Sequence, residues 1–149
     1  MSQMSSGELL IVEDSDDDLE LTLRALKGIN LLDKVRAVRD GKEALDYIFA
    51  KGTDNTEKAD CLKAIMLDLK LPKVSGLEVL KKLKSDERTK SIPIVVLTSS
   101  KEGSDLKECY EFGVNSYIVK PFALEEFVKA VSTAGLYWLV VNQPPRPEG

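Results

Sequence analysis

Two short apolar runs, at residues 9–12 and 64–67, each lead directly into acidic side chains. The first run is followed by Glu13 and Asp14, and the second is followed by Asp68. In an open parallel sheet the strands end at one common edge, and ligands bind just beyond that edge. Two such strands side by side would gather three carboxylates, which is unfavourable unless a cation or a proton neutralises them. Because the chain contains no histidine, we expect a hard divalent cation with oxygen ligands, and in particular Mg²⁺.

Strand-like and helix-like segments alternate five times along the chain. The expected strands are residues 9–12, 35–38, 64–67, 92–97 and 116–119. The expected helices cover residues 16–27, 42–51, 77–83, 102–112, and a last segment from 124 that extends as far as 141. This alternation predicts an α/β fold, a doubly wound five-stranded parallel sheet with helices on both faces.

The length and composition fit one compact domain. The chain has 149 residues, of which 43% are hydrophobic, as is typical of a soluble globular protein. We expect a disordered N-terminus at residues 1–7, one domain at 8–141 and an extended, proline-containing tail at 142–149. Residues 52–61 are polar and are expected to form a long loop.

Charge and apolar patterning exclude several classes of partner. A net charge of -4 does not favour nucleic-acid binding, and no apolar run approaches the ~20 residues that span a bilayer. The first residues lack the basic and apolar regions of a signal peptide. The two cysteines, Cys61 and Cys109, are far apart in sequence, so we expect reduced thiols and a cytoplasmic location.

Two further strand ends carry polar groups, Thr98 and Lys120. All of these groups should emerge at one sheet edge, with Asp68 as the best candidate nucleophile. Phosphoryl transfer depends on positioning and charge stabilisation, for which acids, a hydroxyl and an ammonium are suitable. Each residue alone also has an ordinary explanation: an acid after a strand caps a helix, Thr98 caps the next helix, and Lys120 is a solvated charge. Four strand ends that supply complementary groups favour a functional site.

These motifs together resemble those of the receiver domain of two-component response regulators. The similar segments are residues 12–14, 67–72 with 75–76, 97–99 and 117–122, and the resemblance extends over about residues 8–135. It implies a flavodoxin-like sheet with strand order 2-1-3-4-5, and it implies that Asp68 accepts a phosphoryl group from a histidine kinase.

The resemblance also implies roles for the other residues at this edge. Glu13 and Asp14 match the acidic pair that binds Mg²⁺, with the backbone carbonyl of Lys70 as a further ligand. The family uses residues at the positions of Thr98 and Lys120 to contact the phosphoryl group, and an aromatic residue at that of Tyr117 as a switch. Two departures are Glu13, where Asp is common, and Lys70, whose effect on phosphate lifetime has no predictable sign.

The C-terminal end suggests a surface for protein contacts. The run Leu136, Tyr137, Trp138 and Leu139 is apolar all round, so part of it should remain exposed as a homodimer interface. The alternative is a helix end that folds back on its own domain. A helical face with Leu124 and Trp138 could pack on the sheet. This ending resembles that of the small stand-alone regulators that partner cyanobacterial phytochrome kinases.

The sequence therefore predicts a phosphoacceptor switch, not an enzyme with its own substrate. It would act in a phosphorelay, in a light-sensing phytochrome pathway, and signal to an unknown downstream protein. One alternative is a receiver-like binding module that is never phosphorylated. Another alternative is an aspartyl-phosphate hydrolase. Such enzymes have a second acid, which acts as general acid, two residues after the nucleophile, and this chain has Lys70 at that position.

Overall fold

The computed structural model describes residues 7–50 and 58–144. At its centre lies a five-stranded sheet in the order β2-β1-β3-β4-β5, and every neighbouring pair is parallel. The strands are β1 Glu8–Val12, β2 Val35–Val38, β3 Leu62–Leu67, β4 Ile94–Thr98 and β5 Ser116–Val119. The predicted fold class and the strand order are both confirmed.

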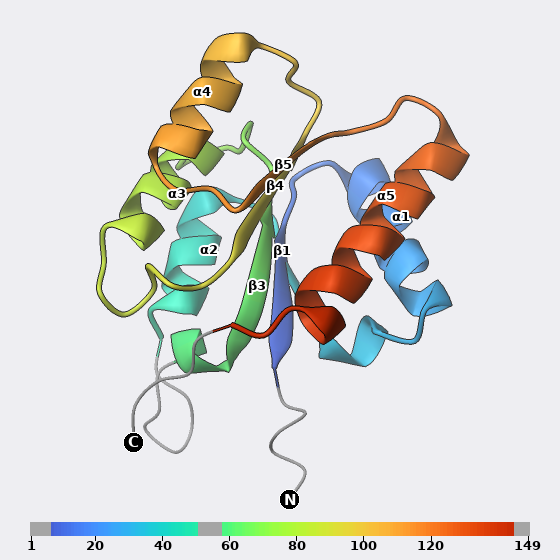
Figure 1. Cartoon of the computed structure of the whole chain (residues 1–149), viewed down its shortest axis with the longest axis horizontal. Coiled ribbons are helices and arrows are strands. Elements are labelled where there is room, and N and C mark those ends of the chain that lie inside the picture. The colour runs from blue at the N-terminus through green and yellow to red at the C-terminus, as the bar shows by residue number, and fades with distance from the viewer. Residues whose placement is uncertain (1–6, 51–57, 145–149) are drawn as a thin grey trace, which may run out of the picture.

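Helices cover both faces of the sheet (Figure 1). The α-helices are α1 Asp16–Gly28, α2 Gly41–Ile48, α3 Gly76–Lys84, α4 Gly103–Glu111 and α5 Leu124–Gly135. Helices α1 and α5 lie side by side on one face, and α2, α3 and α4 cover the other. Short 3₁₀ turns, which periodicity did not predict, occur at Leu32–Lys34 and Lys58–Cys61.

Local side-chain chemistry starts several of these helices where the chain leaves a strand. Ser15, Asp40 and Ser75 each accept a hydrogen bond from a backbone N–H in the first turn of the helix that follows. Ser75 and Glu78 form a complete capping box at the start of α3. Gly113, with φ at +90°, lies just beyond the end of α4, in the left-handed conformation that glycine adopts readily after a helix.

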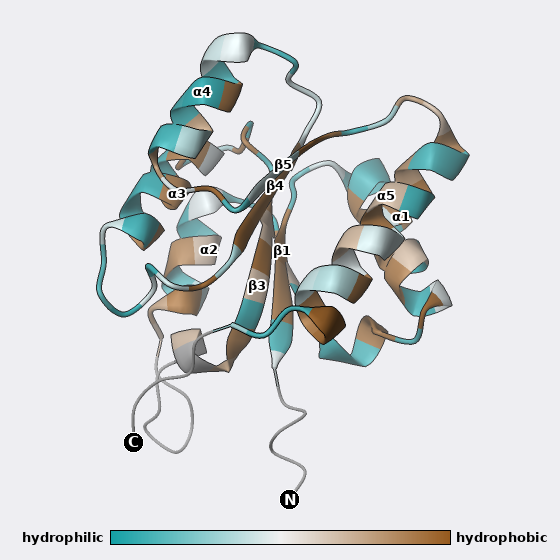
Figure 2. Cartoon of the chain, viewed as in Figure 1, coloured by the Kyte–Doolittle hydropathy of each residue, from teal (hydrophilic) through white to brown (hydrophobic). Residues whose placement is uncertain are grey.

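Two apolar clusters separated by the sheet form the core. Strand side chains point alternately to the two faces: Leu10 and Ile65 pack with α2 and α3, whereas Leu9 and Met66 pack with α1 and α5. Figure 2 shows the strands mostly brown, while the helices carry teal residues on their outer surface. Burial of the strands on both faces explains why they are apolar runs without alternation.

The boundaries differ from the sequence prediction in a few places. Strand β4 begins at Ile94 and not at residue 92, because Pro93 has no N–H to donate to a neighbouring strand. The prediction that Leu124 packs on the sheet is wrong, because its side chain is 58% exposed. Of the predicted loop at 52–61, residues 52–57 lie outside the described residues, as do 1–6 of the predicted N-terminus and 145–149 of the predicted tail.

The last helix continues to Val141, but its final turn has a different geometry. Residues Leu136–Val141, η4, form a π-helix directly after α5. Leu139 is buried in the core, and its carbonyl oxygen accepts a hydrogen bond from Nζ of Lys63 in β3 at 2.9 Å. In the part of the chain that the structure describes, no helix is both long and apolar enough to cross a membrane.

Candidate functional site

The predicted site residues lie together at the carboxyl edge of the sheet. Hydrogen bonds between neighbouring strands continue one residue beyond β1 and β3. The N–H of Glu13 donates to the carbonyl oxygen of Val38, and the N–H of Asp68 donates to that of Val12. The N–H of Lys120 likewise donates to the carbonyl oxygen of Thr98 at 2.7 Å. The sheet itself therefore fixes the backbone of each group, as expected for ligand sites at the ends of parallel strands.

Three carboxylates form an acidic cluster at this edge. Glu13, Asp14 and Asp68 each offer one oxygen atom, and these atoms lie within 4.8 Å of one another. Mg²⁺ takes an octahedron of oxygens at about 2.0–2.1 Å, so its ligand atoms are about 3 to 4 Å apart. Glu13 and Asp68 are buried whereas Asp14 is exposed, which leaves one side open to water and to a reacting group. The donor set therefore fits a hard divalent cation.

The ammonium group of Lys120 balances part of this negative charge. Its Nζ lies 2.8 Å from Oε1 of Glu13, 3.1 Å from Oδ2 of Asp68 and 2.7 Å from Oδ2 of Asp18. The Lys120 side chain is only 8% exposed, so solvent screens these ion pairs less than pairs on the surface. A solvated surface lysine, the ordinary explanation for Lys120, is thereby excluded.

Burial and hydrogen bonding act in opposite directions on the pKa values of Glu13 and Lys120, and both pKa values are raised. Burial raises the pKa of Glu13 to about 7, although the hydrogen bond from Lys120 acts against this shift. For Lys120, burial alone would lower the pKa, but hydrogen bonds to Asp18 and Glu13 outweigh burial and raise that pKa. Lys120 therefore remains a cation at neutral pH.

Thr98 and Tyr117 are linked through the loop that follows β4. The Thr98 side chain is fully buried, and its Oγ1 accepts a hydrogen bond from the N–H of Ser100 at 3.3 Å. The hydroxyl of Tyr117 donates to the carbonyl oxygen of Ser100 at 3.1 Å. Ser100 Oγ also lies 2.6 Å from a carboxylate oxygen of Asp105 in α4.

Lys70 and Gly76 shape the loop between β3 and α3. The N–H of Lys70 donates to Oδ1 of Asp68 at 3.3 Å, while the Lys70 side chain is exposed. Gly76 comes so close to the backbone of Asp68 and Leu69 that a Cβ atom at this position would overlap both. The loop is thus folded tightly against the nucleophile candidate.

The predicted interface residues lie at the opposite edge of the sheet. Leu136 and Tyr137 are 47% and 46% exposed, and Trp138 packs against the core next to α5. Leu139 is 3% exposed and faces the core, which is the arrangement of a helix end that folds back on its own domain.

One member of the site was not predicted as such. Asp18 lies in the first turn of α1 and was not among the predicted site residues, but its carboxylate reaches Lys120 across the edge of the sheet. The local sequence offers no signal that separates Asp18 from Asp16 and Asp17, which lie in the same first turn of α1.

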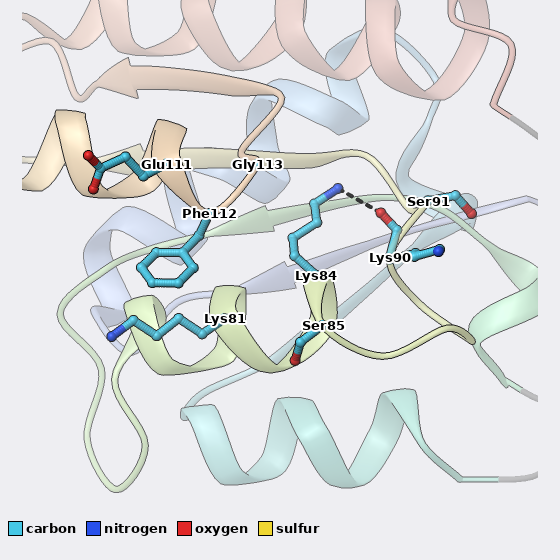
Figure 3. Close-up of a pocket in the computed structure, with 8 residues that line it drawn as sticks. All are labelled: Lys81, Lys84, Ser85, Lys90, Ser91, Glu111, Phe112 and Gly113. Atoms are coloured by element: carbon cyan, nitrogen blue, oxygen red, sulfur yellow. Dashed lines mark hydrogen bonds between the residues drawn. The ribbon is translucent and has the colours of Figure 1, made fainter.

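A pocket at the amino edge of the sheet contains different chemistry (Figure 3). Its lining includes Lys84, whose ammonium group donates to the carbonyl oxygens of Lys90 and Ile92 and to Oδ1 of Asn115. These three bonds use all three ammonium donors, so Lys84 ties together the segments that precede β4 and β5. The pocket lacks the acid cluster of the carboxyl edge.

Comparison with known proteins agrees with this geometry. The family model described as "Response regulator receiver domain" matches residues 9–132. The chain is 38% identical over 139 residues to the probable methanogenesis regulatory protein FilR2 of Methanothrix harundinacea, a match that covers 93% of this chain and 88% of FilR2. It is 36% identical over 131 residues to the response regulator Rcp1 of Synechocystis sp., covering 88% of each chain.

Two solved structures are similar over almost the whole chain. The phosphorylated cyanobacterial phytochrome response regulator RcpA superposes with a TM-score of 0.83 at 36% identity, covering 93% of this chain and 98% of RcpA. The Mn²⁺-bound form of Rcp1 gives a TM-score of 0.83 at 35% identity, covering 93% of this chain and 99% of that structure.

Proposed function

The chain belongs to the response regulator receiver domain family, and from this premise we propose that it is a switch that accepts a phosphoryl group on Asp68 from a histidine kinase. The observation that carries the proposal is the position of the Asp68 carboxylate, which lies both in the acidic cluster and 3.1 Å from Nζ of Lys120. The nucleophile is thereby held beside two sources of positive charge, the ammonium group and the cation that the cluster fits.

The proposed transfer uses the carboxylate as nucleophile. One oxygen of Asp68 forms a bond to phosphorus, the bond from phosphorus to the donor nitrogen breaks, and that nitrogen keeps the electron pair. Lys120 hydrogen-bonds the oxygens of the phosphoryl group, and Thr98 donates to the same group when its hydroxyl turns toward the site. When bound, Mg²⁺ would supply positive charge to neutralise the transferring group. Glu13, Asp14, Asp68 and the carbonyl oxygen of Lys70 would hold it.

The signal then passes to β5 through the loop after β4. If Thr98 moves toward the phosphoryl group, Ser100 moves with it, because its N–H is bonded to the Thr98 hydroxyl. Tyr117 is bonded to Ser100 in turn, so its side chain is the proposed readout of phosphorylation. These two hydrogen bonds, between Ser100 and Thr98 and between Tyr117 and Ser100, support Tyr117 as the switch residue.

The pathway and partners are also part of the proposal. Similarity to RcpA, a cyanobacterial phytochrome response regulator, supports a phytochrome as the kinase and a light-sensing phosphorelay in the cytoplasm. Exposed side chains of η4 support a homodimer: Leu136, Tyr137, Val140 and Val141 are each 46% to 61% exposed. We leave Leu139 out of this interface because it is buried.

The decisive experiment is phosphoryl transfer to the intact chain. The wild-type chain, incubated with Mg²⁺ and a small phosphodonor such as acetyl phosphate, is expected to gain one phosphoryl group by mass spectrometry. Asp68→Asn should gain none, whereas Asp17→Asn, which removes an exposed acid from the first turn of α1, should behave as wild type. Equal incorporation by Asp68→Asn and wild type would refute the proposal.

A further inference from the structure

Lys120 has one carboxylate partner that the proposed phosphotransfer does not explain. Glu13 and Asp68, at 2.8 and 3.1 Å, are the proposed metal ligand and the proposed acceptor. The remaining partner, Asp18, makes the shortest contact, 2.7 Å from its Oδ2 to Nζ. Among the described residues, Asp18 does not belong to the group of acids that could hold a cation. The ion pair that its carboxylate forms is with Lys120.

The backbone of Asp18 is fixed on both sides. Its N–H donates to Oγ of Ser15 at 3.2 Å, and its carbonyl oxygen accepts a hydrogen bond from Oγ1 of Thr22 at 2.8 Å. Helix α1 in turn packs beside α5 through Leu26, which is fully buried. The backbone of Asp18 is thus fixed near the end of β5, and its carboxylate, on a side chain that is 31% exposed, lies 2.7 Å from Nζ of Lys120.

We propose that Asp18 is a positioning residue that holds the ammonium group of Lys120 throughout phosphotransfer; this inference rests on the proposed function. An ammonium group has three N–H donors in a fixed arrangement. When Glu13 turns to the cation and Asp68 carries a phosphoryl group, Asp18 is the carboxylate that still bonds Lys120. One N–H anchored on Asp18 directs the other two toward phosphoryl oxygens, so little reorganisation is needed as charge develops there.

The test compares two acids on the same helical turn. Asp18→Asn and Asp17→Asn remove the same charge, but Asp17 is exposed. With acetyl phosphate and saturating Mg²⁺, phosphoryl incorporation into the full chain is expected to slow about tenfold for Asp18→Asn and less than twofold for Asp17→Asn. The Mg²⁺ dissociation constant, measured by calorimetry, should change less than about twofold in both variants, because neither residue is a proposed ligand.

A double variant separates positioning from a general structural effect. In a chain that already carries Lys120→Met, Asp18→Asn is expected to change the residual incorporation rate less than twofold, because its partner is already absent. A further tenfold loss in that background would overturn the inference, as would an Asp18→Asn chain as fast as Asp17→Asn. If the wild-type chain took up no phosphoryl group at all, the proposed function itself would fail, which is a distinct result.

Discussion

The hydroxyl group of Tyr117 donates a hydrogen bond to the backbone carbonyl oxygen of Ser100 at 3.1 Å. The N–H of Ser100 donates in turn to the side chain of Thr98. One residue of the loop after β4 therefore joins the buried threonine at the site to an aromatic side chain on the edge strand β5. A displacement of this loop has to change the environment of Tyr117.

Tyr117→Phe removes this link without changing the ring. We expect the free energy of unfolding to fall by about 1 kcal/mol, the usual net value of a partly buried hydrogen bond. Urea unfolding followed by circular dichroism measures the change. Tyr110→Phe is the matched control, because Tyr110 is 53% exposed on α4. Equal stability of the two variants would contradict a structural role for the bond.

Asp14→Asn tests the cation site in a way that leaves Lys120 intact. Asp14 belongs to the acidic cluster but is exposed and is not among the carboxylates that bond Nζ of Lys120. Loss of one anionic ligand should weaken Mg²⁺ binding by at least about tenfold, while the melting temperature of the metal-free chain changes little. Isothermal calorimetry provides the affinity. Unaltered affinity would remove Asp14 from the proposed ligand set.

Sequence patterns predicted the sheet edge well because its determinants are local. Strands β1, β3 and β4 contain apolar runs that lead directly to Glu13, Asp68 and Thr98. Right-handed crossovers leave a few doubly wound arrangements, and the order 2-1-3-4-5 came from the resemblance to receiver domains. Strands β2 and β5 occupy the residues that periodicity indicated. The convergence of Glu13, Asp68 and Lys120 then follows from parallel strands that end at one edge.

Features that depend on packing between distant segments were not predictable. The contact between Asp18 and Lys120 joins residues 102 positions apart, and it exists because α1 and α5 share one face of the sheet. Periodicity also placed Leu124 on the packed face of its helix. This residue is the first of α5, and its side chain is only partly covered. The change from α-helix to π-helix after Gly135 has no local sequence signal that we can identify.

Val140→Glu tests the proposed dimer. Val140 is 52% exposed on η4, so a charge there should not disturb the core but should oppose burial in an interface. We expect self-association to weaken at least about tenfold in sedimentation velocity experiments. Leu32→Glu, at an apolar residue that is 39% exposed beside β2, is the control. If neither variant changes the sedimenting mass of a dimeric chain, η4 is not the interface.

The two cysteines should differ in reactivity. Burial raises the pKa of the Cys109 thiol to about 11, whereas Cys61 is exposed. At pH 8 only about one Cys109 thiol in a thousand is ionised, so a disulfide reagent should modify one thiol per folded chain and two after unfolding. Because folding raises this pKa, its contribution to stability is complete below pH 9 and declines as the pH rises towards 11. Rapid modification of both thiols in the folded chain would contradict the burial of Cys109.

Gly76→Ala should damage both the fold and the site. A Cβ atom on Gly76 would lie 2.6 Å from Cα of Leu69 and would overlap the carbonyl oxygen of Asp68, so the loop that carries the acceptor has to move. We expect a loss of about 3 kcal/mol in the free energy of unfolding, together with slower phosphoryl incorporation. Gly103→Ala is the matched control, since it also changes the first residue of a helix but has no atom within 4 Å of the added Cβ. That control should be neutral or more stable by about 0.5 kcal/mol, because alanine reduces the entropy of the unfolded chain. If Gly76→Ala unfolded at the same urea concentration as Gly103→Ala, the close approach of α3 to Asp68 would not constrain the site.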